Sequence, residues 1–367
     1  MSEGMRILSL GVEQPGKAYF FEYEDGALQQ GSFRIETLYT GLSAGTELTF
    51  LKGSNPYLHA RWDEHFAVFL PEEPTARFPV PFLGYMECGR VVESRARHVH
   101  PGQIVAMAYG HKTAHTADPR VEFFAPVPDN LDPLLGIFIA QMGPICANGL
   151  LHAAAELTGN TVRDLSDGVR GRNVLVMGAG VIGLLTALFV RHCGAATVAV
   201  ADAVPIRRNI AGQLGFPVVE EEEAWRYCKE TWSHGGADRG ADVAFQCRAH
   251  SLSLHQALRA LRPQGTVIDL AFYQRGAEEL RLGEEFHHNA LSIRCAQIGR
   301  VPRGLSFTWD RQRLAQQTVQ LLRAEGQAIR DHIITNVIPL NEAPKFLTHL
   351  IEQRPDFLQI VFQVVHE

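Results

Sequence analysis

The stretch NVLVMGAGVIGLLTALFV, residues 173–190, decides the fold of this chain. Residues 173–177 have the pattern of a buried strand, and residues 181–190 have the pattern of an apolar helix. Between them, three glycines stand in the order GxGxxG. The first permits a tight turn, the second lets a pyrophosphate approach the backbone, and the third lets the helix pack on the strand. The stretch therefore predicts a dinucleotide site made by Gly178, Ala179, Gly180, Val181, Ile182 and Gly183.

A second strand pattern, residues 197–201, ends in Asp202. This carboxylate follows Gly178 by 24 residues (202 − 178), close to the spacing at which an acidic residue binds the adenosine ribose. Because a carboxylate repels a 2'-phosphate, we expect NAD(H) as the cofactor. Arg207 and Arg208 keep NADP(H) as the alternative, since a guanidinium binds phosphate. The competing interpretation of Asp202 is the N-cap of the next helix.

The composition is typical of a globular protein, with 46% hydrophobic and 20% charged residues. A net charge of -6 gives no overall positive field for nucleic acid or anionic lipid. The uncharged run at 174–190 is shorter than the roughly 20 residues that span a bilayer. Six cysteines without CxxC spacing, together with no visible export signal, predict a cytoplasmic protein.

The chain has two regions with different sequence patterns, and its 367 residues are enough for two domains. Short β patterns fill the first 135 residues, whereas residues 150–300 alternate strand and helix and so predict an α/β fold with a doubly wound parallel sheet. Later helix patterns at 311–325 and 343–353 precede a strand pattern that returns to the first domain. We therefore predict one domain from 1–149 and 301–367, and a nucleotide domain from 150–300. The short β patterns lie at 18–24, 32–39, 89–93, 103–109 and 121–128, and the returning strand lies at 358–365.

An aromatic segment with little periodic structure runs from Gly53 to Pro79. Tyr57 and Trp62 are its candidate substrate contacts, because long loops in compact domains often shape a pocket. A packed surface loop is the alternative.

Four further motifs carry a family resemblance; they are Thr40-Gly41-Leu42-Ser43-Ala44-Gly45-Thr46-Glu47, Leu282-Gly283-Glu284-Glu285-Phe286-His287, Ile293-Arg294 and Trp309-Asp310. With the glycine loop, they make the chain resemble the medium-chain dehydrogenase/reductase superfamily, and within it the subgroup that includes bacteriochlorophyllide hydroxyethyl dehydrogenases. The resemblance covers the whole chain. It implies a GroES-like β-rich catalytic domain joined to a Rossmann nucleotide domain, and an NAD(P)-dependent enzyme.

The chain departs from the zinc-dependent members of this superfamily at each ligand position. Ser43 replaces a cysteine, Tyr85-Met86 replaces His-Glu, and Gly143 replaces an acidic residue. These groups are poor zinc ligands, so no catalytic zinc is expected. The structural zinc lobe is missing as well, because Cys88 is the one cysteine between residues 80 and 140. A different metal site remains the alternative, built from Glu47, Glu87, Cys88, Cys146, His98, His100, His111 and His115.

Without a metal, hydrogen-bond donors must stabilise the reacting oxygen, and a side chain must take or give the proton. The resemblance places Tyr85 beside the reacting oxygen. It also suggests a hydroxyl chain through Ser43 and Thr46 that ends at the Glu47 carboxylate. His287 is a further candidate acid or base. The alternatives are a core phenol for Tyr85, turn hydroxyls for Ser43 and Thr46, and, for His287 with its neighbour His288, a stretch that faces the domain cleft or a dimer partner.

The resemblance also implies which residues surround the nicotinamide: Gln246, Ala271, Phe272 and Tyr273. Strand 291–298 is expected at a sheet edge through which relatives form homodimers. The sequence thus predicts a zinc-independent NAD(P)-dependent oxidoreductase that moves hydride between nicotinamide and an alcohol or carbonyl carbon. A bulky substrate is expected, of a sugar or secondary-metabolite class. The alternatives are an enone or quinone double-bond reductase, a redox-neutral epimerase that retains NAD, and a nicotinamide-binding sensor without catalysis.

Overall fold

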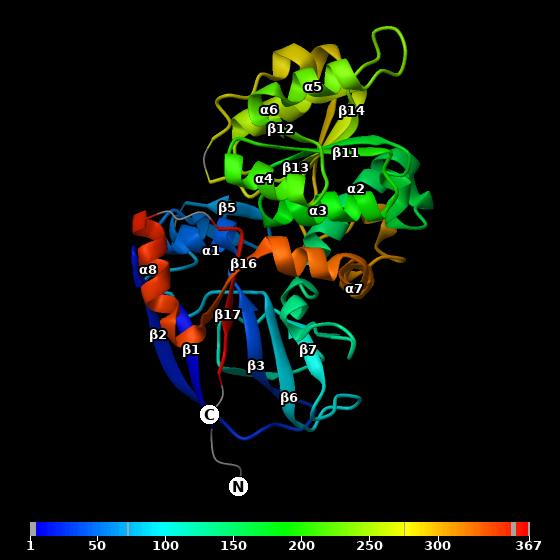
Figure 1. The fold of residues 1–367 in the computed structure, drawn as a ribbon. Helices are drawn as coiled ribbons and strands as arrows, with labels where there is room; N and C mark the ends of the chain where they lie inside the picture. The colour runs from blue at the N-terminus through cyan, green and yellow to red at the C-terminus, as the bar shows by residue number, and fades with distance from the viewer. Residues whose placement is uncertain (1–4, 72, 275, 354–356, 366–367) are drawn as a thin grey trace. The chain divides into compact units, whose positions relative to one another are not determined.

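The protein is described by a computed structural model, which covers residues 5–71, 73–274, 276–353 and 357–365 (Figure 1). The chain forms two compact units, Met1–Gln141 with Ile334–Glu367, and Met142–Ile333. These boundaries differ from the predicted ones at 149/150 and 300/301. The difference arises because the helices α2 (Met142–Thr158) and α7 (Arg311–Ala328) both belong to the second unit. They approach closely at Gly143, where a Cβ would lie 2.1 Å from the Thr318 side chain.

The second unit is built on a six-stranded parallel sheet in the order β12-β11-β10-β13-β14-β15. This confirms the predicted doubly wound nucleotide fold. Its strands are β10 (Asn173–Met177), β11 (Thr197–Asp202), β12 (Val218–Glu220), β13 (Ala241–Gln246), β14 (Leu261–Asp269) and β15 (Ser292–Cys295). Its other helices are α3 (Val181–His192), α4 (Pro205–Gln213), α5 (Ala224–Thr231) and α6 (Ser251–Ala260).

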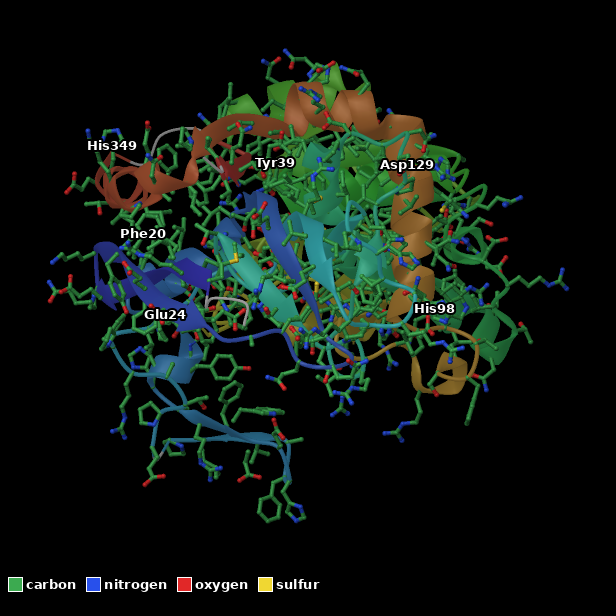
Figure 2. The ribbon with its side chains drawn as sticks, turned by 90° about the horizontal axis from the view of Figure 1, so that it is seen from below. Phe20, Glu24, Tyr39, His98, Asp129 and His349 are labelled. Carbon is green, nitrogen blue, oxygen red and sulfur yellow. The ribbon has the colours of Figure 1, made fainter. Side chains whose placement is uncertain are left out.

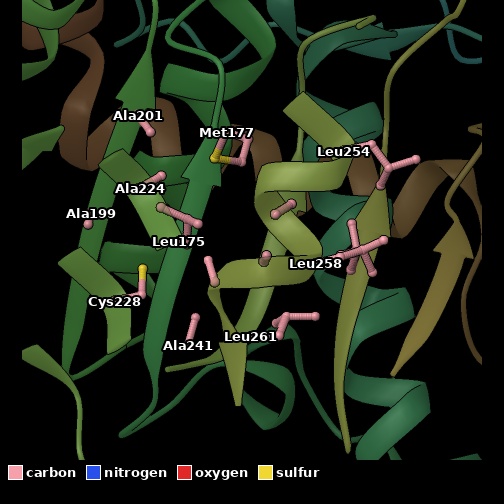
Figure 3. Packing of buried hydrophobic residues seen from close by; sticks show 14 of the residues in the cluster. Leu175, Met177, Ala199, Ala201, Ala224, Cys228, Ala241, Leu254, Leu258 and Leu261 are labelled. Atoms are coloured by element: carbon pink, nitrogen blue, oxygen red, sulfur yellow. The ribbon is translucent and has the colours of Figure 1, made fainter. Parts of the chain in front are cut away.

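Small and branched apolar side chains fill the core on one face of this sheet (Figure 3). Leu175 and Met177 of β10 pack there with residues of α5 and α6, such as Cys228 and Leu258. Strand β15 forms the sheet edge that the sequence predicted, and most of its residues are exposed.

The first unit is β-rich, as predicted, and contains a sheet in the order β16-β17-β3-β6-β7-β9, with β8 also paired to β3. Its strands are β1 (Met5–Gln14), β2 (Lys17–Asp25), β3 (Phe33–Gly41), β4 (Arg61–Asp63), β5 (Val68–Leu70), β6 (Glu87–Ser94), β7 (Ile104–Met107), β8 (Ala114–Ala117), β9 (Ala125–Pro126), β16 (Ile334–Pro339) and β17 (Gln359–Gln363). Its helices are α1 (Ala44–Leu51) and α8 (Ala343–Gln353). Strand β17 pairs antiparallel with β3, so the end of the chain does return to the first unit.

Helix α8 packs on β2, and Figure 2 labels His349 on the helix and Phe20 on the strand.

Two expectations were wrong in detail in this unit. Residues 121–128 form a loop except for the short strand β9. Val121 lies in this loop without a strand partner and is 81% exposed. The aromatic segment contains a β4–β5 hairpin, which projects from the rest of its unit (Figure 2).

No helix in the described part of the chain is long and apolar enough to cross a membrane.

Candidate functional site

The glycine loop of the second unit has the geometry that a pyrophosphate requires. Gly178 has a φ of +98°, a left-handed conformation that favours glycine. A Cβ on Gly183 would lie 1.6 Å from the Gly178 carbonyl oxygen, so helix and strand touch there. By contrast, a Cβ on Gly180 would meet no atom within 4 Å. Gly180 is the N-cap of α3 and offers no side-chain cap, which leaves the first N–H groups of the helix for an anion.

Asp202 ends β11 beside this loop and is 1% exposed. Its Oδ2 accepts a hydrogen bond from the Ala179 N–H at 2.8 Å, and its Oδ1 accepts one from the Val204 N–H at 2.7 Å. The carboxylate therefore fixes the loop conformation, and each oxygen keeps a lone pair for a ribose hydroxyl. The N-cap of α4 is Val204, so the N-cap interpretation of Asp202 was wrong.

The two arginines after Asp202 have different surroundings. Arg208 donates to the Asp202 carbonyl at 2.8 Å and to Glu220 Oε1 at 2.7 Å. These two hydrogen bonds hold its side chain at the sheet edge. Arg207 is half-buried on the first turn of α4.

A polar group lies at the carboxyl ends of β13 and β14, where ligands bind in parallel sheets. Gln246 Nε2 donates to the Arg248 carbonyl at 2.7 Å and to the Tyr273 hydroxyl at 3.2 Å. The Tyr273 hydroxyl donates to Asp269 Oδ2 at 2.9 Å, and the Ala271 N–H donates to Asp269 Oδ1 at 2.9 Å. Sequence reasoning missed Asp269, although a carboxylate that ends an apolar strand is a signal. Burial raises the pKa values of Asp269 and Tyr273.

Phe272 follows this group and is 40% exposed. His287 is exposed in the same unit, next to the His288 ring with centroids 5.7 Å apart. The structure does not join His287 to the polar group around Gln246 by any contact among the described residues.

The candidate catalytic hydroxyls meet in the first unit. Ser43 is the N-cap of α1, yet its side chain makes no cap and hydrogen-bonds the Tyr85 hydroxyl instead. The Tyr85 hydroxyl also donates to Thr46 Oγ1 at 3.3 Å. Burial raises the pKa of Tyr85, and the Glu47 carboxylate raises it further, against the opposing effect of the bonds to Ser43 and Thr46. Tyr85 is therefore a neutral phenol at neutral pH.

Glu47 takes a different place from the predicted one. Its Oε1 accepts the Ser43 backbone N–H at 2.7 Å, and its Oε2 lies 2.6 Å from His111 Nε2. The hydroxyl chain thus ends at Thr46, because no described hydroxyl of the group reaches the carboxylate.

Three buried residues extend this arrangement, and sequence reasoning considered two of them only as metal ligands. Thr40 Oγ1 donates to Glu87 Oε1 at 2.9 Å and lies 2.6 Å from His111 Nδ1. The other Glu87 oxygen accepts the Tyr109 N–H at 2.7 Å. Burial raises the pKa of Glu87, although His111 opposes it. Burial lowers the pKa of His111, but the carboxylates of Glu47 and Glu87 outweigh burial and raise it.

The residues at the zinc ligand positions do not fit a zinc ion. Ser43 and Tyr85 supply hydroxyls that bond to each other, and Gly143 faces Thr318 too closely for any side chain. Glu47, His111 and Glu87 of the alternative metal site are held by hydrogen bonds among themselves and Thr40. Burial raises the pKa of Cys88 to about 12, so the free side chain is a thiol at neutral pH.

Among the described residues, His255, Glu284 and Glu285 bring possible ligand atoms within 4.8 Å of one another. Glu284 is exposed, and Glu285 is already paired with Arg259 at 3.4 Å. Within the described residues, His255 Nδ1 and Glu285 Oε2 are buried and have no hydrogen-bond partner.

The candidate substrate residues lie on the aromatic segment, with Trp62 in the β4–β5 hairpin and Tyr57 in the short 3-10 helix Pro56–Leu58 before it. The Phe69 ring lies between Trp62, at a centroid distance of 5.0 Å, and Tyr57, at 5.6 Å. Trp62 also lines an open cavity of about 910 Å³, whereas Tyr57 does not. The rest of that lining is mostly polar and charged: Arg61, Asp63, Glu64, His65, Glu73, Pro74, Thr75 and Arg77.

Known proteins resemble this chain in sequence and in fold. Residues 181–307 match the sequence model of the zinc-binding dehydrogenase family. D-guloside 3-dehydrogenase of Escherichia coli (strain K12) is 24% identical over 350 residues, which cover 93% of this chain and 95% of that protein.

Two solved structures share the fold. Galactitol-1-phosphate dehydrogenase from Escherichia coli superposes with a TM-score of 0.73 at 14% identity, over 97% of this chain and 99% of that one. A putative zinc-binding dehydrogenase from Sinorhizobium meliloti 1021, bound to NADP, gives 0.69 at 20% identity, over 99% and 100%.

Proposed function

We propose that this chain, a member of the zinc-type alcohol dehydrogenase-like superfamily, is a zinc-independent NAD(P)-dependent dehydrogenase of sugar-like alcohols. The observation that carries the proposal is the bonded hydroxyl pair of Ser43 and Tyr85 at positions where zinc-dependent members hold ligands. Hydroxyl groups of this kind bind a substrate oxygen by hydrogen bonds and do not need a metal between them.

The nucleotide would bind at the glycine loop, with its pyrophosphate on the open face of Gly180 and the α3 N-terminus. Asp202 would accept hydrogen bonds from the ribose hydroxyls, which favours NAD(H). The Arg207 guanidinium would bind a 2'-phosphate, which keeps NADP(H) as the alternative. Gln246, Ala271, Phe272 and Tyr273 would border the nicotinamide. When bound, the nicotinamide supplies the hydride acceptor or donor.

The residues of the first unit would manage the substrate oxygen and its proton. Tyr85 is a neutral phenol, so it can accept a hydrogen bond from an alcohol, or turn its one proton from Thr46 to a carbonyl oxygen. Ser43 and Thr46 hold the Tyr85 hydroxyl in position. Glu47 would act through the hydrogen bond that it accepts from the Ser43 backbone N–H, and not by direct proton transfer. His287 stays a candidate acid or base.

A sugar or glycoside is the proposed substrate class. D-guloside 3-dehydrogenase, by its name, oxidises a sugar derivative, and it matches nearly the whole chain. The aromatic segment offers the rings of Tyr57 and Trp62, and Trp62 lies next to charged groups, a combination that suits the apolar faces and hydroxyls of a sugar ring. The resemblance to the bacteriochlorophyllide subgroup rests on sequence motifs, and it does not exclude a sugar or glycoside as the substrate.

The test is oxidation of a panel of glycosides and polyols with NAD+ or NADP+, followed as absorbance at 340 nm on chelator-treated protein. We expect a ring hydroxyl of a glycoside to be oxidised. Reduction of an enone or quinone without any alcohol oxidation would instead select a double-bond reductase. Tightly bound nucleotide with no net absorbance change would select an epimerase, and binding without turnover would select a sensor.

We also propose a homodimer formed through the exposed edge strand β15, since an open strand edge is a template for pairing. Light scattering coupled to gel filtration tests it, and a mass near 40.7 kDa would mean a monomer. All six cysteines are free, which suits the proposed cytoplasmic location.

A further inference from the structure

Two acidic side chains and one imidazole are buried together behind the hydroxyl pair. Glu47 is 3% exposed, and His111 and Glu87 are 0% exposed. Charged groups are rarely buried so completely unless they are paired, and a buried pair is costly to assemble. Their position against the segments that carry Ser43 and Tyr85 suggests a role beyond packing.

Glu47 controls the position of Ser43. Its Oε1 accepts the Ser43 N–H at 2.7 Å, while its Oε2 is held by His111 Nε2 at 2.6 Å. One carboxylate therefore links the backbone of the first hydroxyl residue to the imidazole. A carboxylate fixed at both oxygens leaves Ser43 little freedom to turn away.

His111 controls the position of Tyr85. Gly84, which precedes Tyr85, has a φ of +100°, and a Cβ there would lie 2.8 Å from His111 N and 2.9 Å from His111 Nδ1. The backbone at Gly84 thus lies against His111 and also against Glu87, whose Oε1 would be 2.9 Å from that Cβ. The His111 N–H also donates to the Leu83 carbonyl at 2.7 Å, one residue further back.

The hydrogen bonds around His111 also indicate which of its two ring nitrogens carry a proton. Thr40 donates its single hydroxyl proton to Glu87 Oε1, so it must accept from His111 Nδ1. His111 Nε2 faces the Glu47 carboxylate, which can only accept. This arrangement favours hydrogen on both ring nitrogens, in line with the raised pKa of His111, and pairs the ring with the Glu47 carboxylate.

We propose that the buried Glu47–His111 ion pair is a positioning device that sets the Ser43 and Tyr85 hydroxyls for the reaction. Glu47 ties down the Ser43 backbone, and His111 supports the turn before Tyr85. This inference rests on the proposed function, because it assigns a purpose to the same hydroxyl pair. Neither residue touches the reacting oxygen.

The experiment compares two variants with the parent. Glu47→Gln keeps the shape and removes the charge, and His111→Gln keeps a donor toward Glu47 and leaves the carboxylate. Both should lower kcat by about ten- to hundredfold with little change in KM, because a misplaced catalytic group costs rate more than binding. Since the variants are independent, a failure of one to fold leaves the other to decide.

A second readout follows Tyr85 itself by carbon-13 NMR of protein labelled at the tyrosine ζ carbon, with Tyr85→Phe for assignment. The groups that act on Tyr85 are the charges of Glu47 and Glu87 and the hydroxyls of Ser43 and Thr46. Glu47→Gln should lower the pKa of Tyr85, whereas His111→Gln should not lower it. The split measures the through-space effect of the Glu47 charge on the Tyr85 hydroxyl, and the comparison of kcat with KM separates positioning from a merely structural role.

Glu122→Gln is the matched control, because Glu122 Oε2 pairs with His115 Nε2 at 2.7 Å in the same unit and touches neither hydroxyl residue. It should change neither kcat nor the Tyr85 titration. Parent-like kcat and parent-like Tyr85 titration in Glu47→Gln would overturn the inference. If no alcohol is oxidised at all, the proposed function fails, while the NMR titration still decides whether Glu47 and His111 act on Tyr85.

Discussion

The side-chain hydroxyls of Ser43 and Tyr85 are hydrogen-bonded to each other although the residues lie 42 positions apart in the chain. Tyr85→Phe removes one partner of this bond and the donor proposed for the substrate oxygen. We expect kcat to fall by about a hundred- to a thousandfold, the usual cost of removing one donor at a developing charge. Steady-state kinetics measure the loss. Tyr23→Phe on β2 is the control, and equal activity of both variants would remove Tyr85 from the mechanism.

Gly180→Val should abolish nucleotide binding without unfolding the protein. The space before Gly180 is open, so a side chain enters it without a clash but occupies the path of the pyrophosphate. Calorimetric titration with NADH measures the affinity. Gly212→Ala in α4, where a Cβ also meets nothing within 4 Å, is the control. Retained affinity in Gly180→Val would mean that the nucleotide binds elsewhere.

Asp202→Ala should shift cofactor preference toward NADP(H), because the charge that opposes a 2'-phosphate is removed. The same change leaves the Ala179 and Val204 N–H groups without their acceptor, so we also expect a loss of about 1–3 kcal/mol in the free energy of unfolding. Asp202→Asn keeps an oxygen acceptor and should retain more stability. The ratio of dissociation constants for NAD(H) and NADP(H) tests the assignment, which an unchanged ratio would contradict.

Stability should fall with rising pH because of His111. Its pKa is raised above 6.5 in the folded state, so its stabilising contribution is complete below pH 6.5 and is lost as pH rises through the folded value. A tenfold gain in the proton affinity of the imidazole on folding corresponds to about 1.4 kcal/mol. Urea unfolding between pH 6 and 9 should show this decline in the parent and a smaller one in His111→Gln. Parallel curves for the two proteins would show that the imidazole gains no proton on folding.

The sequence was sufficient for the nucleotide unit, because the glycine loop and the strand that ends at Asp202 are local patterns with one structural solution. The parallel sheet and the return of β17 followed from the same periodicity. The compact units end at other residues than the predicted domains, since α7 has the pattern of any amphipathic helix and only its packing against α2 assigns it to a unit.

The polar cluster was beyond sequence reasoning for a different reason. Thr40 and Glu87 meet because β3 and β6 pair in a register that places them opposite each other, and His111 arrives from a separate turn. Register and loop placement depend on long-range pairing, which no local pattern encodes. Ser43 and Tyr85 were predicted individually, whereas their bond to each other required the structure.

The most direct test of the central claim is the rate of NADH formation from an oxidisable glycoside before and after exhaustive removal of metal by a chelator. The account predicts the same rate in both samples, with no gain when zinc is added, because the hydroxyls of Ser43 and Tyr85 hold the substrate oxygen. Activity that disappears with the metal and returns with stoichiometric zinc would contradict it.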